Sequence, residues 1–274
     1  MGGGVMSMDW QNSPASTDYS IEELIITVLA DQFNNGDQAT NGMGSFIPVA
    51  AFMLARMTHA PELIWLASSV GLEPRPDRIP ASTLEAPLWK DSIMYIEQYG
   101  DFWNFVSNGR WIEKFCVGAA QLDKFGNANN SVIGKDYHKP KVRLPGTAGL
   151  ADLCSMGKQL YFWNLHHSPR SLVDKVDFIS GAGYLDGGDA RERLGLGAGP
   201  QIVATNLAVI DFHPESKHMR LKSVHPGFSV DDVQQQTGFE LLIPEDGVVQ
   251  TKIPSQAQIS LIREVIDPDG MRGK

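Results

Sequence analysis

Continuous apolar runs of strand length recur along this chain, separated by segments with helical periodicity. The runs cover residues 62–67, 115–120 and 160–165, with a shorter one at 176–179. Strands that are apolar throughout, rather than at alternate residues, are typical of parallel sheets with both faces covered. Parallel neighbours need long connections between them, so the pattern predicts an α/β fold with an open, mostly parallel sheet covered by helices.

Capping signals indicate where the helices begin. Ser20 and Glu23 have the spacing of a capping box, and the apolar residues after them predict a helix that ends near Phe33. Pro48 suits the first turn of a second helix, which we expect to run to about His59. The other expected elements are helices at 230–236 and after 255, a pair of strands at 202–212 and 219–224, a loop at 71–87, and partly helical structure at 89–109.

The length and composition are those of one folded domain. A chain of 274 residues can bury a core without disulfides or metals, and we expect 19–274 to form a single domain after a flexible segment at 1–18. Hydrophobic residues make up 42% and charged residues 20%, which excludes wholesale disorder and membrane spanning. With a net charge of -9 and no run of Lys or Arg, the chain is not expected to bind nucleic acid.

The cysteines and the N-terminus indicate the compartment. Cys116 and Cys154 lie in apolar segments and form no C-x-x-C pair, which suits a reducing environment. Residues 1–7 lack the basic and apolar regions of a signal peptide. We therefore expect a cytoplasmic protein.

Two loops of small residues are candidate ligand sites. Gly42 and Gly44 precede the second expected helix, where backbone N–H groups can approach an anion or an oxyanion. Gly146, Thr147 and Gly149 form a similar loop, of the kind that can build an oxyanion hole. For Gly42 and Gly44 the alternative is a structural tight turn, and for the loop at 146–149 it is a backbone nest without a ligand. These interpretations remain open.

Polar residues after the run at 115–120 form a third candidate. Gln121 can hold a ligand carbonyl or amide, and Asn127 lies in the turn that follows. The alternative is that Gln121 and the neighbouring asparagines only fix the turn. The stretch 181–199 contains seven glycines, and two interpretations of it remain: a functional loop or a disordered one.

Metal and serine-hydrolase chemistry find little support. The histidines form no H-E-x-x-H or comparable pair at metal-ligand spacing, so we expect no metal site. Ser180 lies in Ile-Ser-Gly-Ala-Gly and not in the G-x-S-x-G motif of a nucleophile elbow.

Taken in order, several motifs resemble those of the β subunit of class I CoA-transferases. They span roughly residues 20–268 and include G-D at 36–37, G-x-G-x-x-x-P at 42–48, G-A-A-Q-L-D-K-F-G-N-A-N at 118–129, G-x-x-G at 146–149, V-D-F-I at 176–179, V-A-T-N-L-A-V-I-D-F at 203–212 and H-P-G-F-x-V at 225–230. The resemblance implies a Rossmann-like sheet of the CoA-transferase type, no bound cofactor, and a coenzyme A thioester as substrate. It also implies a homologous α subunit as partner, in an α2β2 assembly.

One position departs from the family pattern. In the family's transferases a β-subunit glutamate, in a Ser-Glu-Asn-Gly-like strand end, attacks the acyl-CoA thioester. The corresponding stretch here, 66–71, has Ser69 at that position, and Glu73 lies beyond the glycine. A serine hydroxyl without an adjacent base is a poor nucleophile, so the resemblance leaves the catalytic residue of this chain unassigned. The loop at 146–149 also departs from the family's Gly-Ser-Gly-Gly-Ala.

A branch of the family shares this kind of departure. The sequence is similar, around 126–127 and at 265–268, to the β subunits of CoA-transferase-like hydrolases that open rings in steroid catabolism. There the resemblance implies that the acting glutamate lies on the α subunit as a general base. Three functions stay open: a transferase subunit whose site is shaped by Gly42, Gly146 and Gln121, a ring-opening hydrolase subunit, and a non-catalytic partner. A sugar-phosphate isomerase of similar fold is disfavoured because no basic phosphate site is apparent.

Overall fold

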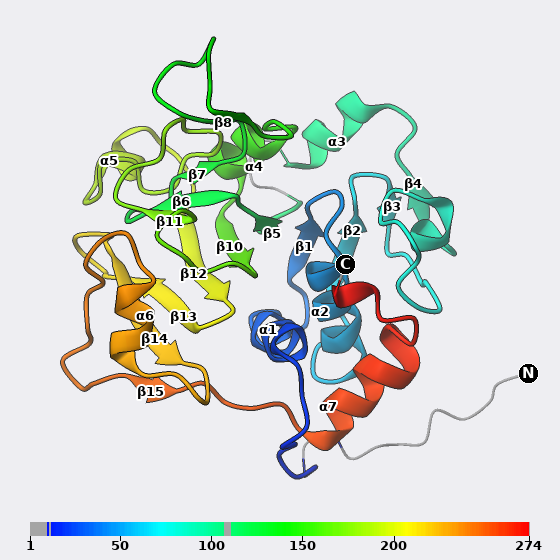
Figure 1. Ribbon diagram of the computed structural model, residues 1–274. Coiled ribbons are helices and arrows are strands. Elements are labelled where there is room, and N and C mark those ends of the chain that lie inside the picture. Colours follow the sequence, from blue (N-terminus) through cyan, green and yellow to red (C-terminus); the bar gives the residue numbers. More distant parts are fainter. Residues whose placement is uncertain (1–9, 11, 107–110, 274) are drawn as a thin grey trace, which may run out of the picture.

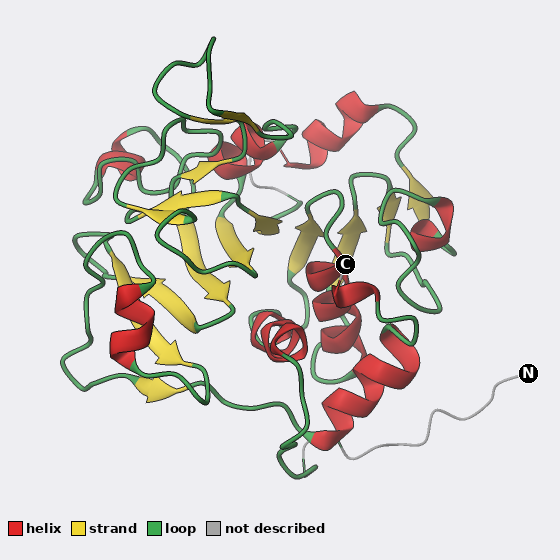
Figure 2. Ribbon diagram, viewed as in Figure 1, coloured by secondary structure: helices red, strands yellow, loops and turns green. Residues whose placement is uncertain are grey.

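A ten-stranded sheet forms the centre of the computed structural model, which describes residues 10, 12–106 and 111–273. Its strand order is β15–β14–β13–β12–β10–β5–β1–β2–β3–β4 (Figures 1 and 2). The strands are β1 (Gln38–Asn41), β2 (Ile64–Ala67), β3 (Gly71–Leu72), β4 (Met94–Tyr95), β5 (Lys114–Gly118), β10 (Gln159–Asn164), β12 (Gly199–Thr205), β13 (Ala208–Phe212), β14 (Met219–Val224) and β15 (Val249–Gln250). Two small sheets pair β11 (Leu172–Val173), β6 (Gln121–Asp123) and β7 (Ala128–Asn129), and β8 (Val132–Ile133) with β9 (Val142–Arg143).

Helices cover both faces of this sheet. They are α1 (Ile21–Ala30), α2 (Phe46–Met57), α3 (Tyr99–Val106), α4 (Leu150–Met156), α5 (Ala190–Arg193), α6 (Val230–Gln235) and α7 (Gln256–Ser260), with shorter or irregular turns at η1 (Ala86–Trp89), η3 (Leu261–Ile266) and η4 (Met271–Gly273). α1, α2 and η3 pack on one face, while α3, α4 and α6 contribute apolar residues to the other. None of the helices in the described part of the chain is long and apolar enough to cross a membrane.

The middle of the sheet is parallel, as the apolar runs predict. β2, β1, β5, β10 and β12 pair in parallel, and the strands beyond them on either side are joined mainly by antiparallel pairing. Side chains alternate between two cores: Cys116 of β5 packs against one face, and Phe115 and Val117 against the other. Both faces are apolar because both are buried, which confirms the predicted α/β class.

β1 is a central strand that no apolar run predicts. It lies between β2 and β5, yet its sequence is Gln-Ala-Thr-Asn. Two of its polar side chains are satisfied inside the sheet, since Thr40 Oγ1 donates to the carbonyl of Leu66 (2.5 Å) and Asn41 bonds to the neighbouring strand β2 and its turn. Hydrogen bonding takes the place of apolar packing at this strand.

Several expected elements differ from the structure. The expected loop at 71–87 begins with the short strand β3 (Gly71–Leu72). No strand forms at 176–179: Val176 is buried, but Phe178 and Ile179 are exposed. The segment 202–212 is two strands, because Thr205 Oγ1 accepts hydrogen bonds from the N–H groups of Leu207 (3.2 Å) and Ala208 (3.1 Å) and fixes a tight turn. In the partly helical stretch at 89–109, α3 forms, and residues 107–109 lie outside the described part.

The start of the chain packs on its end. Residues 1–9 and 11 lie outside the described part, but the N–H of Ser16 donates to Pro254 O (2.8 Å). Glu23, fully buried, accepts hydrogen bonds from Arg263 (2.8 Å) and Arg272 (2.9 Å). Asp18 pairs with Arg263 as well (2.9 Å). The described part of the segment expected to be flexible, 12–18, is therefore bonded to the C-terminal part of the chain through Ser16 and Asp18.

The glycine-rich stretch at 181–199 is organised around a buried arginine. Arg191 is 3% exposed and has no carboxylate partner among the described residues. Its guanidinium donates to four backbone carbonyls, those of Cys154 (2.6 Å), Ala182 (2.8 Å), Gly183 (2.9 Å) and Gly197 (2.6 Å). The stretch is thus a folded structural loop.

Candidate active site

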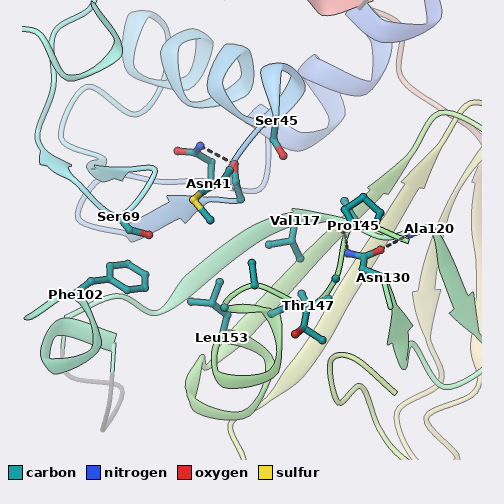
Figure 3. Close-up of a pocket in the computed structure, with 17 residues that line it drawn as sticks. Asn41, Ser45, Ser69, Phe102, Val117, Ala120, Asn130, Pro145, Thr147 and Leu153 are labelled. Carbon is teal, nitrogen blue, oxygen red and sulfur yellow. Dashed lines mark hydrogen bonds between the residues drawn. The ribbon is translucent and has the colours of Figure 1, made fainter. Parts of the chain in front are cut away.

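A pocket of about 370 Å³ opens at the carboxyl ends of the parallel strands. It lies where β1 and β5 meet, and the chain leaves these two strands toward opposite sides of the sheet. Ligands of open α/β sheets bind at such a reversal of strand order. The described residues that line it are Asn41, Gly42, Met43, Ser45, Ser69, Phe102, Val117, Gly118, Ala120, Asn130, Pro145, Gly146, Thr147, Ala148, Gly149, Leu150 and Leu153 (Figure 3).

Asn41, the last residue of β1, holds one side of the pocket together. Its Oδ1 accepts from the indole Nε1 of Trp65 (2.9 Å) and from the N–H of Ser68 (3.4 Å). Its Nδ2 donates to Ser68 Oγ (3.1 Å) and to Gly42 O (3.0 Å). One buried amide thereby joins β1, β2 and the two loops that follow them.

Ser69 lies in the tight turn that Asn41 supports. Ser68 and Ser69 have φ angles of 47° and 66°, the left-handed region that costs non-glycine residues free energy, and Val70 N–H closes the turn on Ala67 O (3.0 Å). The Ser69 hydroxyl points into the pocket (Figure 3) and makes no hydrogen bond with the described residues. No base in the described part of the chain lies beside it to activate it.

The opposite wall is the loop that contains Gly146 and Thr147. Gly146 has a φ of 109° and donates its N–H to Asn130 O (2.8 Å), while Ala148 is left-handed at φ 43°. The N–H groups of 147–149 donate to no group among the described residues. Asn130, which the sequence did not single out, fixes the neighbouring strand end by donating to Gly118 O (3.1 Å) and accepting from Ala120 N–H (2.7 Å).

The described lining of this pocket contains no ionisable side chain. It consists of backbone, apolar groups, amides and hydroxyls. Glu73, the nearest carboxylate in sequence to Ser69, is used elsewhere: it pairs with Arg56 (3.2 Å) and accepts the N–H of Trp65 (2.6 Å). The N-terminus of α2, which begins one residue after the lining residue Ser45, adds a partial positive charge. The pocket suits an uncharged group or a developing oxyanion.

Two predicted site residues do not line the pocket. Gln121 is 5% exposed, and its Oε1 accepts from Asn129 Nδ2 (2.7 Å). Asn127 is 2% exposed, donates to Asp123 (3.0 Å) and accepts from the N–H groups of Gly183 (2.9 Å) and Leu185 (3.0 Å). These contacts are those of the structural alternative, in which the residues fix the turn. Burial raises the pKa of Asp123, and the hydrogen bonds from Asn127 oppose that effect.

The other predicted residues lie at or beside the pocket. Gly42, Gly146, Thr147 and Gly149 line it with Ser69. Gly44 lies just outside, where its N–H donates to Thr83 Oγ1 (2.8 Å) at a φ of 73°. The fold therefore brings together loops that are about 100 residues apart in the sequence.

Other reactive side chains are buried away from this pocket. Burial, with a contribution from His225, lowers the pKa of His167 to about 4, and its ring bonds to the hydroxyls of Thr205 and Thr237 (both 2.9 Å). Burial raises the pKa of Cys154 to about 12 and also raises that of Cys116, so both thiols are unreactive at neutral pH. Within the described ranges, no group of three His, Cys, Asp or Glu residues is placed to hold a metal.

Comparison with known proteins connects the chain to one enzyme family. The family model described as coenzyme A transferase matches residues 23–236. The chain is 33% identical to a 3-oxoadipate CoA-transferase subunit of Pseudomonas knackmussii over 246 residues, which cover 89% of this chain and 92% of that protein. It is 30% identical to the cholesterol ring-cleaving hydrolase IpdB subunit of Mycobacterium tuberculosis over 254 residues, or 92% and 96% of the two chains.

A solved structure shows the same fold. Glutaconate coenzyme A-transferase from Acidaminococcus fermentans superposes with a TM-score of 0.83 at 31% identity, over 92% of this chain and 96% of the matched chain. The agreement extends over nearly the whole chain, so it includes the sheet whose strand ends carry the pocket.

Proposed function

Because this chain belongs to the coenzyme A transferase family, we propose that it is the β subunit of a heteromeric enzyme acting on an acyl-CoA thioester. In this proposal the chain binds and orients the acyl group, and a homologous α subunit supplies the acidic residue that reacts. The similarity to proteins that are themselves named as single subunits of CoA-transferases, over nine-tenths of their length, supports the pairing.

The composition of the pocket carries this proposal. Cleavage of a thioester or of an adjacent carbon–carbon bond needs a nucleophile or a general base. The described lining residues offer only the Ser69 and Ser45 hydroxyls and that of Thr147, none of them beside a base. The site is therefore chemically incomplete on the described part of this chain, and an open pocket at the strand ends is where a second subunit would complete it.

The chain's own groups fit a role in stabilising negative charge. The N–H groups of 147–149 are free of internal partners in the described structure, and the N-terminus of α2 lies across the pocket from them (Figure 3). Donors fixed in this way stabilise an oxyanion that forms from a carbonyl without having to reorganise. A pocket that combines these N–H donors with an uncharged lining suits the acyl end of a thioester.

A ring-opening hydrolysis is the second candidate. The family resemblance implies a transferase nucleophile on this subunit, and Ser69 stands at that position. A general base on the partner would take a proton from water, and the resulting hydroxide would add to a ring ketone. The ring bond would then break to give a carboxylate and a carbanion that is protonated. The 30% identity to proteins named ring-cleaving hydrolase subunits supports this candidate.

Reconstitution tests the division of labour. The chain alone should not turn over an acyl-CoA, and the co-expressed α and β subunits should. In the complex, Ser69→Ala should change kcat by less than about threefold, because the hydroxyl is not the attacking group. A loss of about a thousandfold or more would identify Ser69 as a nucleophile and overturn the proposal.

A filled pocket distinguishes a contributing subunit from a scaffold. Ala120→Trp places a large side chain in the pocket from an exposed position, and Ala151→Trp places one on the exposed surface of α4 as a control. If the pocket binds substrate, only the first variant loses turnover while both assemble. Equal activity of the two variants would favour a non-catalytic role for this chain.

A further inference from the structure

A basic hairpin rises from the wall of the pocket. Its stem is β8 and β9, which pair in antiparallel fashion, and its loop is residues 134–141. Hydrogen bonds between the two sides of the hairpin continue beyond the paired strands toward its base: Leu144 N–H donates to Ser131 O (2.9 Å), and Gly146 N–H donates to Asn130 O (2.8 Å). Since Asn130 and Gly146 line the pocket, the base of the hairpin is the pocket wall. The loop projects from the body of the molecule beside α4 (Figure 1).

The hairpin reverses the charge of the protein locally. The chain has a net charge of -9 and no continuous run of Lys or Arg. Residues 134–143 nevertheless carry four cations and one carboxylate, and the hairpin gathers them on one arm. The cations are Lys135, Lys139, Lys141 and Arg143. All four are exposed, and none has an ion-pair partner among the described residues.

Hydrogen bonds and ring contacts fix the conformation of the loop. Asp136 accepts the N–H of His138 (2.9 Å) and so serves as a turn residue. Gly134 N–H donates to Asp177 (3.1 Å), which ties the hairpin to the segment below it. The Arg143 guanidinium lies 4.9 Å from the Tyr137 ring centre, and that ring lies 5.3 Å from Phe178. The two aromatic rings are 48% and 37% exposed, a surface on which a base can stack.

We propose that this hairpin binds the 3′-phospho-ADP end of the coenzyme A thioester. This inference rests on the proposed function and extends it to the other end of the substrate. Coenzyme A carries roughly four negative charges on its phosphates at neutral pH. Its pantetheine chain separates those phosphates from the thioester. From the end of β8, the five residues to His138 reach at most about 18 Å, so the cations stay within about that distance of the strand whose base forms the pocket wall.

The division of the site follows from chemistry. The pocket offers an uncharged lining to the acyl group. The hairpin offers to the nucleotide three lysines with no ion-pair partner in the described part of the chain, and an aromatic surface on which Arg143 already packs. Lysine and arginine bind phosphate by charge-assisted hydrogen bonds. The segment from Lys135 to Arg143 thus supplies the positive charge for phosphate that the pocket lining does not contain.

The test uses the complex of this chain with its α subunit. The variant K135Q/K139Q/K141Q removes three charges, and affinities for free coenzyme A and for pantetheine are measured by calorimetry. We expect the Kd for coenzyme A to rise about tenfold to fiftyfold, since several exposed charge contacts are lost together. The Kd for pantetheine, which has no phosphate, should change by less than about twofold.

A matched control variant has the same change in net charge as the hairpin variant. R75Q/K222Q/K252Q removes three exposed cations elsewhere and should leave both affinities unchanged. Equal coenzyme A affinity in the hairpin variant and the wild type would overturn the inference and leave the proposed function intact. An equal loss for pantetheine, or failure of the hairpin variant to assemble, would also overturn it, because the hairpin would then serve the pocket wall or the subunit interface. A wild-type complex that binds neither compound would contradict the proposed function itself.

Discussion

Replacement of Asn41 by alanine should damage both the fold and the pocket, and the structure sets the size of each effect. The amide is 3% exposed and serves two buried donors, the indole N–H of Trp65 and the backbone N–H of Ser68. A buried donor left without a partner costs about 1–3 kcal/mol. The 3.4 Å bond to Ser68 is the weaker of the two, so we expect the free energy of unfolding to fall by about 2–4 kcal/mol.

The same change should release the turn that presents Ser69. Two consecutive left-handed residues cost of order 1–3 kcal/mol each and persist only where the surroundings hold them. Without the Asn41 amide, Ser68 loses both of its contacts to β1. A wall displaced by about 1 Å can lower catalytic efficiency by about a hundredfold, so kcat/KM for an acyl-CoA should fall by about tenfold to a hundredfold in the assembled enzyme.

Asn127→Ala is the matched control. Asn127 is similarly buried and its Oδ1 likewise accepts two N–H groups, but it lies outside the pocket. Urea denaturation should show a comparable loss of stability in both variants, whereas turnover should fall only for Asn41→Ala. A fall in kcat/KM for Asn127→Ala with full activity of Asn41→Ala would refute the reasoning and restore the sequence-based prediction for Asn127.

Three further predictions concern stability. Because the pKa of His167 is lowered to about 4 in the folded chain, His167 is protonated below about pH 6.5 when the chain is unfolded but only below about pH 4 when it is folded. The unfolding free energy should therefore fall by about 3 kcal/mol over that interval as the pH drops, and His167→Gln should remove that part of the pH dependence. Arg191→Met should destabilise by about 3 kcal/mol or more in urea, because four carbonyls lose their donor; a loss below about 1 kcal/mol would contradict its organising role. In Gly183→Ala the new Cβ would lie 2.2 Å from the backbone carbonyl carbon of Gly126, so a loss of about 4 kcal/mol or absence of folded protein is expected. Gly188→Ala, with open space at a φ of 53°, should cost about 1 kcal/mol, and similar thermal midpoints for the two glycine variants would contradict the packing.

The parallel sheet and the loops of the pocket were accessible from the sequence because they leave local signals. Apolar runs mark β2, β5 and β10, and glycines mark the loops where the backbone turns at the strand ends. Gly42 follows a strand of the parallel sheet, so its place at the ligand-binding edge could be expected, whereas Gly146 reaches the same edge through the hairpin of β8 and β9.

The remaining parts were not accessible because their signals are tertiary. β1 is polar and is stabilised by hydrogen bonds to strands distant in sequence, which no window of residues reveals. The sequence around Gln121 does not distinguish a ligand contact from a contact with Asn129. The pairing of β6 with β7 places Gln121 opposite Asn129 and so determines its partner. The basic hairpin is invisible as a run because its cations alternate with other residues until the turn at 134–141 gathers them.

The most direct measurement is covalent trapping in the assembled enzyme. The complex is incubated with its acyl-CoA and then with borohydride or hydroxylamine, and peptides of both subunits are mapped by mass spectrometry. An enzyme in which this chain provides a pocket without a reacting carboxylate should yield no modified glutamate and no modified Ser69 on this chain. A trapped glutamyl thioester or an acylated Ser69 on this chain would contradict the account.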